Sequence, residues 1–155
     1  IALMLIGAFN VIGSLGSGVL GMRMPKRWIL SFIYLARSVV FTIFLLVPAS
    51  PASVVVFASV IGVLWLSTVP PTNALVAVMF GTRYLAMLGG LVFFSHQIGS
   101  FLGVWLGGWL YDINKSYDPV WWMGVALGIF AGIVHLPIRE TPVERGAPPA
   151  AQPAE

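Results

Sequence analysis

Residues 85–111 read LAMLGGLVFFSHQIGSFLGVWLGGWLY, a stretch without aspartate, glutamate, lysine or arginine. The hydrocarbon core of a bilayer is about 30 Å thick and is crossed by roughly 20 apolar residues of helix. Inside it every backbone amide has to be paired within its own segment, which a helix achieves. The stretch therefore predicts a membrane-spanning helix.

Four further stretches have the same apolar character, namely residues 1–20, 28–47, 54–80 and 121–138. Over the whole chain 59% of the residues are hydrophobic and 8% are charged, whereas a soluble domain carries about 25% charged residues. The sequence thus predicts an all-α integral membrane protein with five transmembrane helices in contact with lipid. Because the chain begins inside a hydrophobic stretch and without methionine, we expect it to be a fragment of a longer protein.

Basic residues gather in alternate connections between the predicted helices, and lysine and arginine are retained on the cytoplasmic side of a membrane. The basic residues on one side of the predicted path are Arg23, Lys26, Arg27, Arg83, Arg139 and Arg145. The other side carries Lys115 with two aspartates in the predicted loop 112–119. We therefore expect a multi-pass protein of the cell (plasma or inner) membrane whose first helix starts outside and whose C-terminus is cytoplasmic. Residues 1–140 form the predicted bundle, and residues 141–155, rich in proline and alanine, a disordered cytoplasmic tail.

Several chemistries find no support in the residues. The chain has no cysteine, which excludes disulfides and thiolate metal sites. The predicted helices hold no paired carboxylates, no histidine pair at metal spacing and no serine, histidine and acid set. We expect no enzyme, no cofactor and no metal. The net charge of +3 follows from the membrane topology, so nucleic acid is not an expected partner.

Glycines recur at four-residue spacing in the last two predicted helices. Small residues at this spacing let helix backbones approach closely in lipid. The two triplets are Gly99, Gly103 and Gly107, and Gly124, Gly128 and Gly132; a looser set of small residues lies at positions 13–21. These patterns predict tight helix contacts, although glycine is also simply frequent in membrane helices.

His96 lies near the middle of the fourth predicted helix, about 16 Å along its axis from Leu85. On a helical wheel it shares a face with Gly89 and Gly103, while Gln97 points about 100° away. Polar groups at membrane depth are costly and mark candidate sites. A histidine there is suited to hydrogen-bond a substrate or to carry a proton, because imidazole titrates near physiological pH. The alternative is a hydrogen bond between helices that only fixes their packing.

Arg37 stands in the otherwise apolar second helix, about 13 Å beyond Trp28. Burying an arginine in lipid costs about 3 kcal/mol or more, so an anion or a run of carbonyl groups is expected to face it. Three arrangements relieve this cost: a substrate carboxylate gripped by the guanidinium, an acid in another part of the protein, or a side chain that reaches the cytoplasmic interface.

The third predicted helix is interrupted by residues 67–73, which read STVPPTN. Pro70 and Pro71 lack amide donors, so the carbonyl groups of Leu66 and Ser67 are expected to be free at mid-depth. Many transporters build binding sites from such discontinuous helices, whereas the alternative is a structural kink satisfied by nearby hydroxyl groups. The candidate residues for substrate binding or coupling are therefore Thr68, Thr72, Asn73, His96, Gln97 and Arg37.

Residues 18–27 read GVLGMRMPKR, with Gly18, Arg23, Lys26 and Arg27 at the spacing of a known loop signature. This signature of the major facilitator superfamily runs glycine, three residues, an acid, a base, any residue, glycine and two bases. The chain resembles this signature, but Met22 stands at the position of the acid and Pro25 at the position of the second glycine. Residues 80–83 (FGTR) and 107–118 (GGWLYDINKSYD) look like the last helices of monocarboxylate-porter-like members.

The resemblance implies the last five helices of a twelve-helix transporter, in its C-terminal half, with helix seven and the whole N-terminal half absent. It implies that the Pro70–Pro71 helix is the tenth and lines the central cavity. The His96 helix would be the eleventh, between the halves, and the Arg37 helix the peripheral ninth.

The expected function is that of a secondary transporter that moves a small organic solute by alternating access. The resemblance favours a monocarboxylate or another organic anion as the solute. The expected partners are this small-molecule substrate, membrane lipid and the missing N-terminal half of the same transporter. The alternative is a non-transporting membrane assembly or structural subunit.

Overall fold

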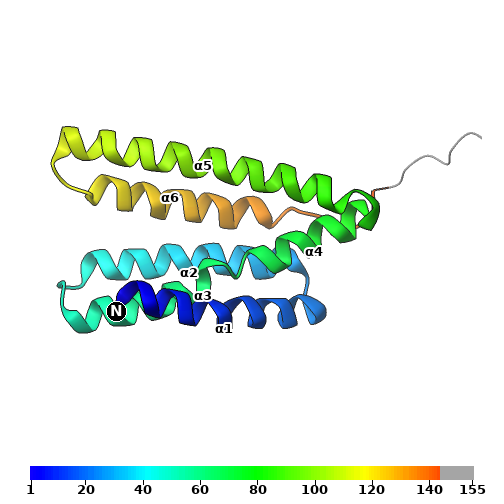
Figure 1. Ribbon diagram of the computed structural model, residues 1–155, viewed down its shortest axis with the longest axis horizontal. Coiled ribbons are helices and arrows are strands. Elements are labelled where there is room, and N and C mark those ends of the chain that lie inside the picture. The colour runs from blue at the N-terminus through cyan, green and yellow to red at the C-terminus, as the bar shows by residue number, and fades with distance from the viewer. Residues whose placement is uncertain (144–155) are drawn as a thin grey trace, which may run out of the picture.

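The computed structural model describes residues 1–143, which contain helices and no β-strand (Figure 1). The elements are α1 (Ala2–Arg23), α2 (Lys26–Leu46), α3 (Pro51–Trp65), α4 (Val69–Phe80), the short 3₁₀ helix η1 (Thr82–Tyr84), α5 (Leu85–Asn114) and α6 (Asp118–His135). Five segments are long and apolar enough to cross a membrane, with α3 and α4 forming one of them. The predicted all-α fold with five spans is confirmed.

Two helix pairs make most of the contacts, α1 with α3 and α2 with α6. In Figure 1 α5 runs beside α6 on the outside of the arrangement. The most apolar part of α5 buries none of its residues among the described helices. The other four spans are therefore held together much more tightly than α5 is held to them.

Two predicted boundaries are wrong. The predicted loop 112–119 is shorter, because α5 continues to Asn114 and α6 already begins at Asp118. Lys115 ends α5 in the left-handed conformation (φ 53°), and its amide donates to the carbonyl of Tyr111 at 2.7 Å. At the other end α6 stops at His135 rather than at residue 138, since Pro137 cannot donate to a continued helix.

The predicted close packing through glycine is confirmed for Gly128 and Gly132 of α6, whereas a Cβ atom at Gly124 would meet nothing within 4 Å. A Cβ atom at Gly128 would fall on the Ser38 hydroxyl of α2, and one at Gly132 would lie 2.7 Å from Leu35 Cγ. In α5 the outcome is different, because no atom of the described residues lies within 4 Å of a Cβ atom at Gly99 or Gly103. Contacts at those two glycines stay a prediction.

Replacing Gly128 by alanine is expected to lower the melting temperature of the full-length protein in detergent. The added methyl group would displace the Ser38 hydroxyl, which donates to the Val125 carbonyl at 3.1 Å. Overpacking and the lost hydrogen bond together correspond to about 1–3 kcal/mol. Gly124→Ala is the matched control, because a Cβ atom there would meet nothing within 4 Å. Equal melting of the two variants would contradict this packing.

The connections rich in basic residues lie at one end of the bundle, on the right in Figure 1. The α1–α2 and α4–α5 connections and the segment after α6 meet there, whereas the α2–α3 and α5–α6 connections lie at the opposite end (Figure 1). This is the alternation that the charges predict. Which end faces the cytoplasm stays a prediction.

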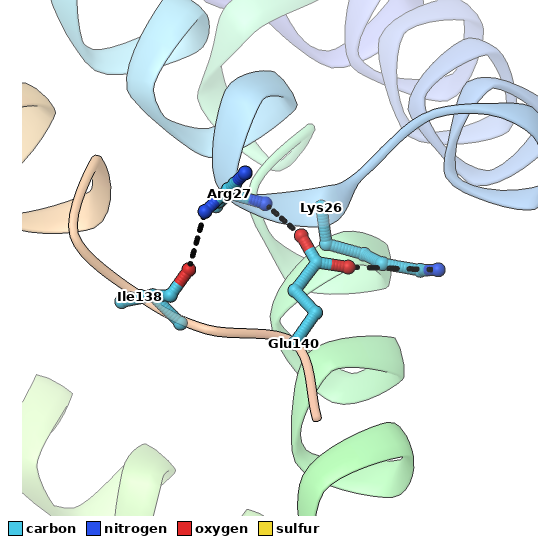
Figure 2. Close-up of polar contacts among 4 residues, drawn as sticks. All are labelled: Lys26, Arg27, Ile138 and Glu140. Atoms are coloured by element: carbon cyan, nitrogen blue, oxygen red, sulfur yellow. Dashed lines mark hydrogen bonds and ion pairs between the residues drawn. The ribbon is translucent and has the colours of Figure 1, made fainter. Parts of the chain in front are cut away.

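Glu140 ties the segment after α6 to the start of α2 (Figure 2). Its Oε1 atom accepts the backbone N–H of Arg27 at 2.7 Å, and its Oε2 atom lies 3.9 Å from Lys26 Nζ. Arg27 Nη1 in turn donates to the carbonyl of Ile138 at 3.1 Å. Because Pro25 gives α2 no side-chain cap, this distant carboxylate satisfies an amide of its first turn.

The predicted disordered tail begins at residue 141, and residues 144–155 lie outside the described residues. Within the described part, the amide of Val143 donates to the carbonyl of Met79 at 2.8 Å. The Met79 carbonyl belongs to the last turn of α4, where carbonyl groups have no partner within the helix. The first residues after the bundle therefore contact α4 as well as α2.

Candidate functional site

The third span is interrupted between Trp65, where α3 ends, and Val69, where α4 begins. The prolines lie in the first turn of α4, where an absent amide removes no hydrogen bond. The prediction that the Leu66 carbonyl is free is therefore wrong, because it accepts the amide of Val69 at 3.0 Å. That the Ser67 carbonyl is free stays a prediction. The last turn of α3 adds carbonyl groups that have no partner within their own helix.

Arg37 of α2 supplies the partners of two of these carbonyl groups. Its Nε atom donates to the carbonyl of Leu64 at 3.0 Å, and its Nη2 atom donates to those of Leu64 and Trp65. The guanidinium also lies over the rings of Tyr34 and Trp65, 5.4 Å and 6.0 Å from their centroids. The structure thus provides the run of carbonyl groups that an arginine in an apolar helix requires.

Helix α1 contacts the same break from another side. Asn10 Oδ1 accepts the amide of Leu66 at 2.9 Å. Three residues further along α1, a Cβ atom at Gly13 would fall on the carbonyl of Val63 and lie 2.5 Å from Ser67 Oγ. Sequence reasoning did not single out Asn10, although a lone amide side chain in an apolar span is the signal that could have found it.

The predicted ligands on α4 lie at and beyond the break. Thr68 is the residue that precedes α4, and Thr72 Oγ1 donates to the Thr68 carbonyl at 2.7 Å. Asn73 is exposed, and its Oδ1 atom lies 4.0 Å from the Cβ position of Gly89 on α5. The structure therefore brings Asn73 to the beginning of α5, while the Thr72 hydroxyl is engaged within its own helix.

His96 and Gln97 are both exposed on α5. Gly89, His96 and Gly107 project from one face of this helix to within about 20°. That face meets α4 at Gly89, next to Asn73, and α6 at Gly107, where Val120 Cγ1 would lie 3.6 Å from a Cβ atom. His96 lies between these two contacts, about 10 Å along the helix from Gly89. His96 therefore lies on the same face of α5 as Gly89, the residue beside Asn73, whereas Gln97 lies on another face.

These groups can donate and accept hydrogen bonds, and Arg37 adds a positive charge that no carboxylate pairs with among residues 1–143. In the same part of the chain no group of histidine, aspartate and glutamate side chains is placed to hold a metal ion. The chemistry that the arrangement supports is the reversible binding of a polar solute at membrane depth.

Comparisons with known proteins agree with the helical architecture. Residues 1–155 match the Major Facilitator Superfamily. A curated relative, YcxA of Bacillus subtilis (strain 168), described as an uncharacterized MFS-type transporter, is 31% identical over 116 residues. This match covers 72% of the chain but 28% of the relative, so the chain spans well under half of that protein's length. No solved structure matches the chain. Because the family match extends over all of its residues, the chain belongs to the major facilitator superfamily.

Proposed function

We propose that this chain is part of a secondary transporter that moves a small organic solute, such as a monocarboxylate or another organic anion, by alternating access. The observation that carries the proposal is the interruption of the third span between α3 and α4, in a chain of this family. A discontinuous helix exposes polar backbone and side-chain groups at a depth where lipid offers none. A solute that crosses the membrane needs such groups on its way.

The proposed solute ligands are the polar groups beside the break that keep hydrogen-bonding capacity. Both Asn73 and His96 are exposed; Asn73 of α4 lies beside Gly89, and His96 is on the same face of α5 as Gly89. Thr68, Thr72 and Gln97 are secondary candidates, since the Thr72 hydroxyl already donates to the Thr68 carbonyl. Side-chain amide, hydroxyl and imidazole groups can donate hydrogen bonds to a carboxylate.

The exposed face of α5 supports the further proposal that another part of the same transporter, its N-terminal half, covers it. Ser95, His96 and Gln97 are consecutive exposed residues in the middle of a span. The Ser95 hydroxyl donates to the carbonyl of Val92 at 2.8 Å, but the side chains of His96 and Gln97 would be costly against lipid. A protein surface or a water-filled pathway against α5 removes this cost.

The test is uptake by the full-length protein reconstituted into proteoliposomes with a proton gradient. We expect labelled lactate to accumulate above the level of protein-free vesicles. Labelled succinate, a dicarboxylate, and labelled glucose, a neutral solute, are the comparison solutes. Uptake of succinate or glucose alone would contradict the monocarboxylate class. Absence of uptake for all of them would contradict transport and favour a membrane assembly subunit.

We also propose that the end of the bundle rich in basic residues faces the cytoplasm of the cell (plasma or inner) membrane. In a full-length protein without other cysteines, Ser50→Cys and Asn114→Cys are expected to react with an impermeant maleimide in intact cells. Lys26→Cys and Arg83→Cys are expected to react only after permeabilisation, because basic connections are retained inside. The reverse labelling pattern would contradict this orientation.

A further inference from the structure

The last turn of α3 ends inside the membrane-spanning segment Pro51–Phe80. The carbonyl groups of a last helical turn have no partners within the helix. In water the solvent would satisfy them, but in lipid each needs a donor from the protein. The break is therefore stable only where other residues supply these donors.

The donors come from the segment that follows α3 and from α2. Ser67 Oγ donates to the carbonyl of Val63, four residues back in the chain. The next two carbonyl groups, of Leu64 and Trp65, both accept from the guanidinium of Arg37. The carbonyl end of a helix also carries a partial negative charge, so a cation is the donor that suits this position best.

Arg37 is itself held in place from several directions. Its guanidinium lies over the rings of Tyr34 and Trp65. One residue further along α2, Ser38 Oγ donates to the carbonyl of Val125 on α6 at 3.1 Å. The guanidinium is thus attached to the tightly packed α2–α6 pair, and through it the end of α3 is attached to that pair as well.

Asn10 supplies the complementary contact from α1, where its side-chain oxygen accepts the amide of Leu66. One helix therefore binds the carbonyl groups on the α3 side of the break, and another binds the first amide after it. Neither contact involves a residue of α4, which begins at Val69. The two contacts fix the end of α3 and the first residue of the short segment 66–68, from which α4 continues.

We infer that Arg37 is a positioning residue rather than a solute ligand: with Asn10, it fixes the end of α3 and thereby sets the bend at which α4 leaves the break. The position of Asn73 and Thr68 in the proposed pathway depends on this bend, so the role of the bend in binding a solute rests on the proposed transport function. The existence of the bend does not rest on it, and the bend can be measured without any transported solute.

The test is a distance measurement by pulsed electron paramagnetic resonance in the full-length protein in lipid nanodiscs. Spin labels at Val56 on α3 and Val78 on α4, both exposed, report the angle across the break. Arg37→Met is expected to widen the distance distribution about twofold, because carbonyl groups left without donors in lipid reorient to find others. Arg37→Lys is expected to restore most of the wild-type width, since an ammonium group can still donate to a carbonyl.

Arg23→Met is the matched control, because this arginine is exposed at the end of α1, and it is expected to leave the distribution unchanged. If Arg37→Met does not accumulate, Arg37→Gln replaces it, since its amide cannot bind both carbonyl groups as the guanidinium does. A wild-type width for either variant would overturn the inference, and so would an equal widening in Arg37→Lys. Proteoliposomes that show no uptake while the distribution widens would reject the proposed transport and leave the positioning role standing.

Discussion

Replacing Gly13 by leucine is expected to be among the most damaging single changes in this chain. A Cβ atom at this position would fall on the backbone carbonyl of Val63, which cannot rotate away as a side chain can. Helix α1 would have to separate from α3 at the break, with a loss of about 3 kcal/mol or more. Thermal unfolding of the full-length protein in detergent measures the effect.

Gly16→Leu is the matched control for this change. It lies one turn along the same helix, and a Cβ atom there would meet nothing within 4 Å. We expect it to melt near the wild-type temperature, whereas Gly13→Leu melts far below it or does not accumulate. Similar melting of the two variants would show that α1 does not approach the break in the way the structure describes.

His96→Ala is expected to reduce uptake at least about tenfold, the range typical of a lost polar contact with a buried partner. The His96 side chain is exposed on α5, and its ring contact is with Phe93 of the same helix, 6.4 Å between centroids, so its removal disturbs no contact between helices among the described residues. Expression and melting temperature should therefore stay near those of the wild type. The pH dependence of the remaining uptake should change as well, since alanine cannot bind or release a proton.

Gln97→Leu is the control for this prediction, because Gln97 is the next residue on α5 and points away from the face that meets α4. Its uptake is expected to fall less than that of His96→Ala. Normal uptake with an unaltered pH profile in His96→Ala would show that His96 takes no part in transport.

The spans could be predicted from the sequence because lipid leaves a long apolar stretch few alternatives to a helix. The break in the third span could be predicted as well, from Pro70 and Pro71, but the fate of the Leu66 carbonyl could not. The prolines begin a new helix instead of ending the old one, and the Leu66 carbonyl accepts the amide of Val69. The carbonyl groups that need a donor from outside their helix include those of the last turn of α3, which the rule for a proline inside a helix does not indicate.

The partners of the break could not be predicted, because they come from distant parts of the chain. Arg37 and Leu64 are 27 positions apart, and Asn10 and Leu66 are 56 apart. Sequence spacing predicts contacts within one helix, whereas these contacts depend on which helices become neighbours. The same holds for Glu140, whose carboxylate reaches the amide of Arg27 across 113 positions.

Glycine spacing alone predicted α6 and α5 to pack alike, and the structure separates them. Gly128 and Gly132 lie against α2, while no described atom lies near Gly103. The two triplets look the same in sequence. Four-residue spacing shows that one face of a helix carries small residues, but it does not show whether another helix packs against that face. The distinction needs the neighbouring helices in place.

The central claim is that the break between α3 and α4 opens onto a pathway that water reaches from each side of the membrane in turn. The most direct test uses Asn73→Cys in the full-length protein without other cysteines, treated with a charged methanethiosulfonate in right-side-out and in inside-out vesicles. Val56→Cys, exposed on α3 within the same span, is the control at a position away from the break. We expect the cysteine at position 73 to react in both kinds of vesicle and the control to react in neither. A cysteine at position 73 that stays as unreactive as the control from both sides would contradict the claim.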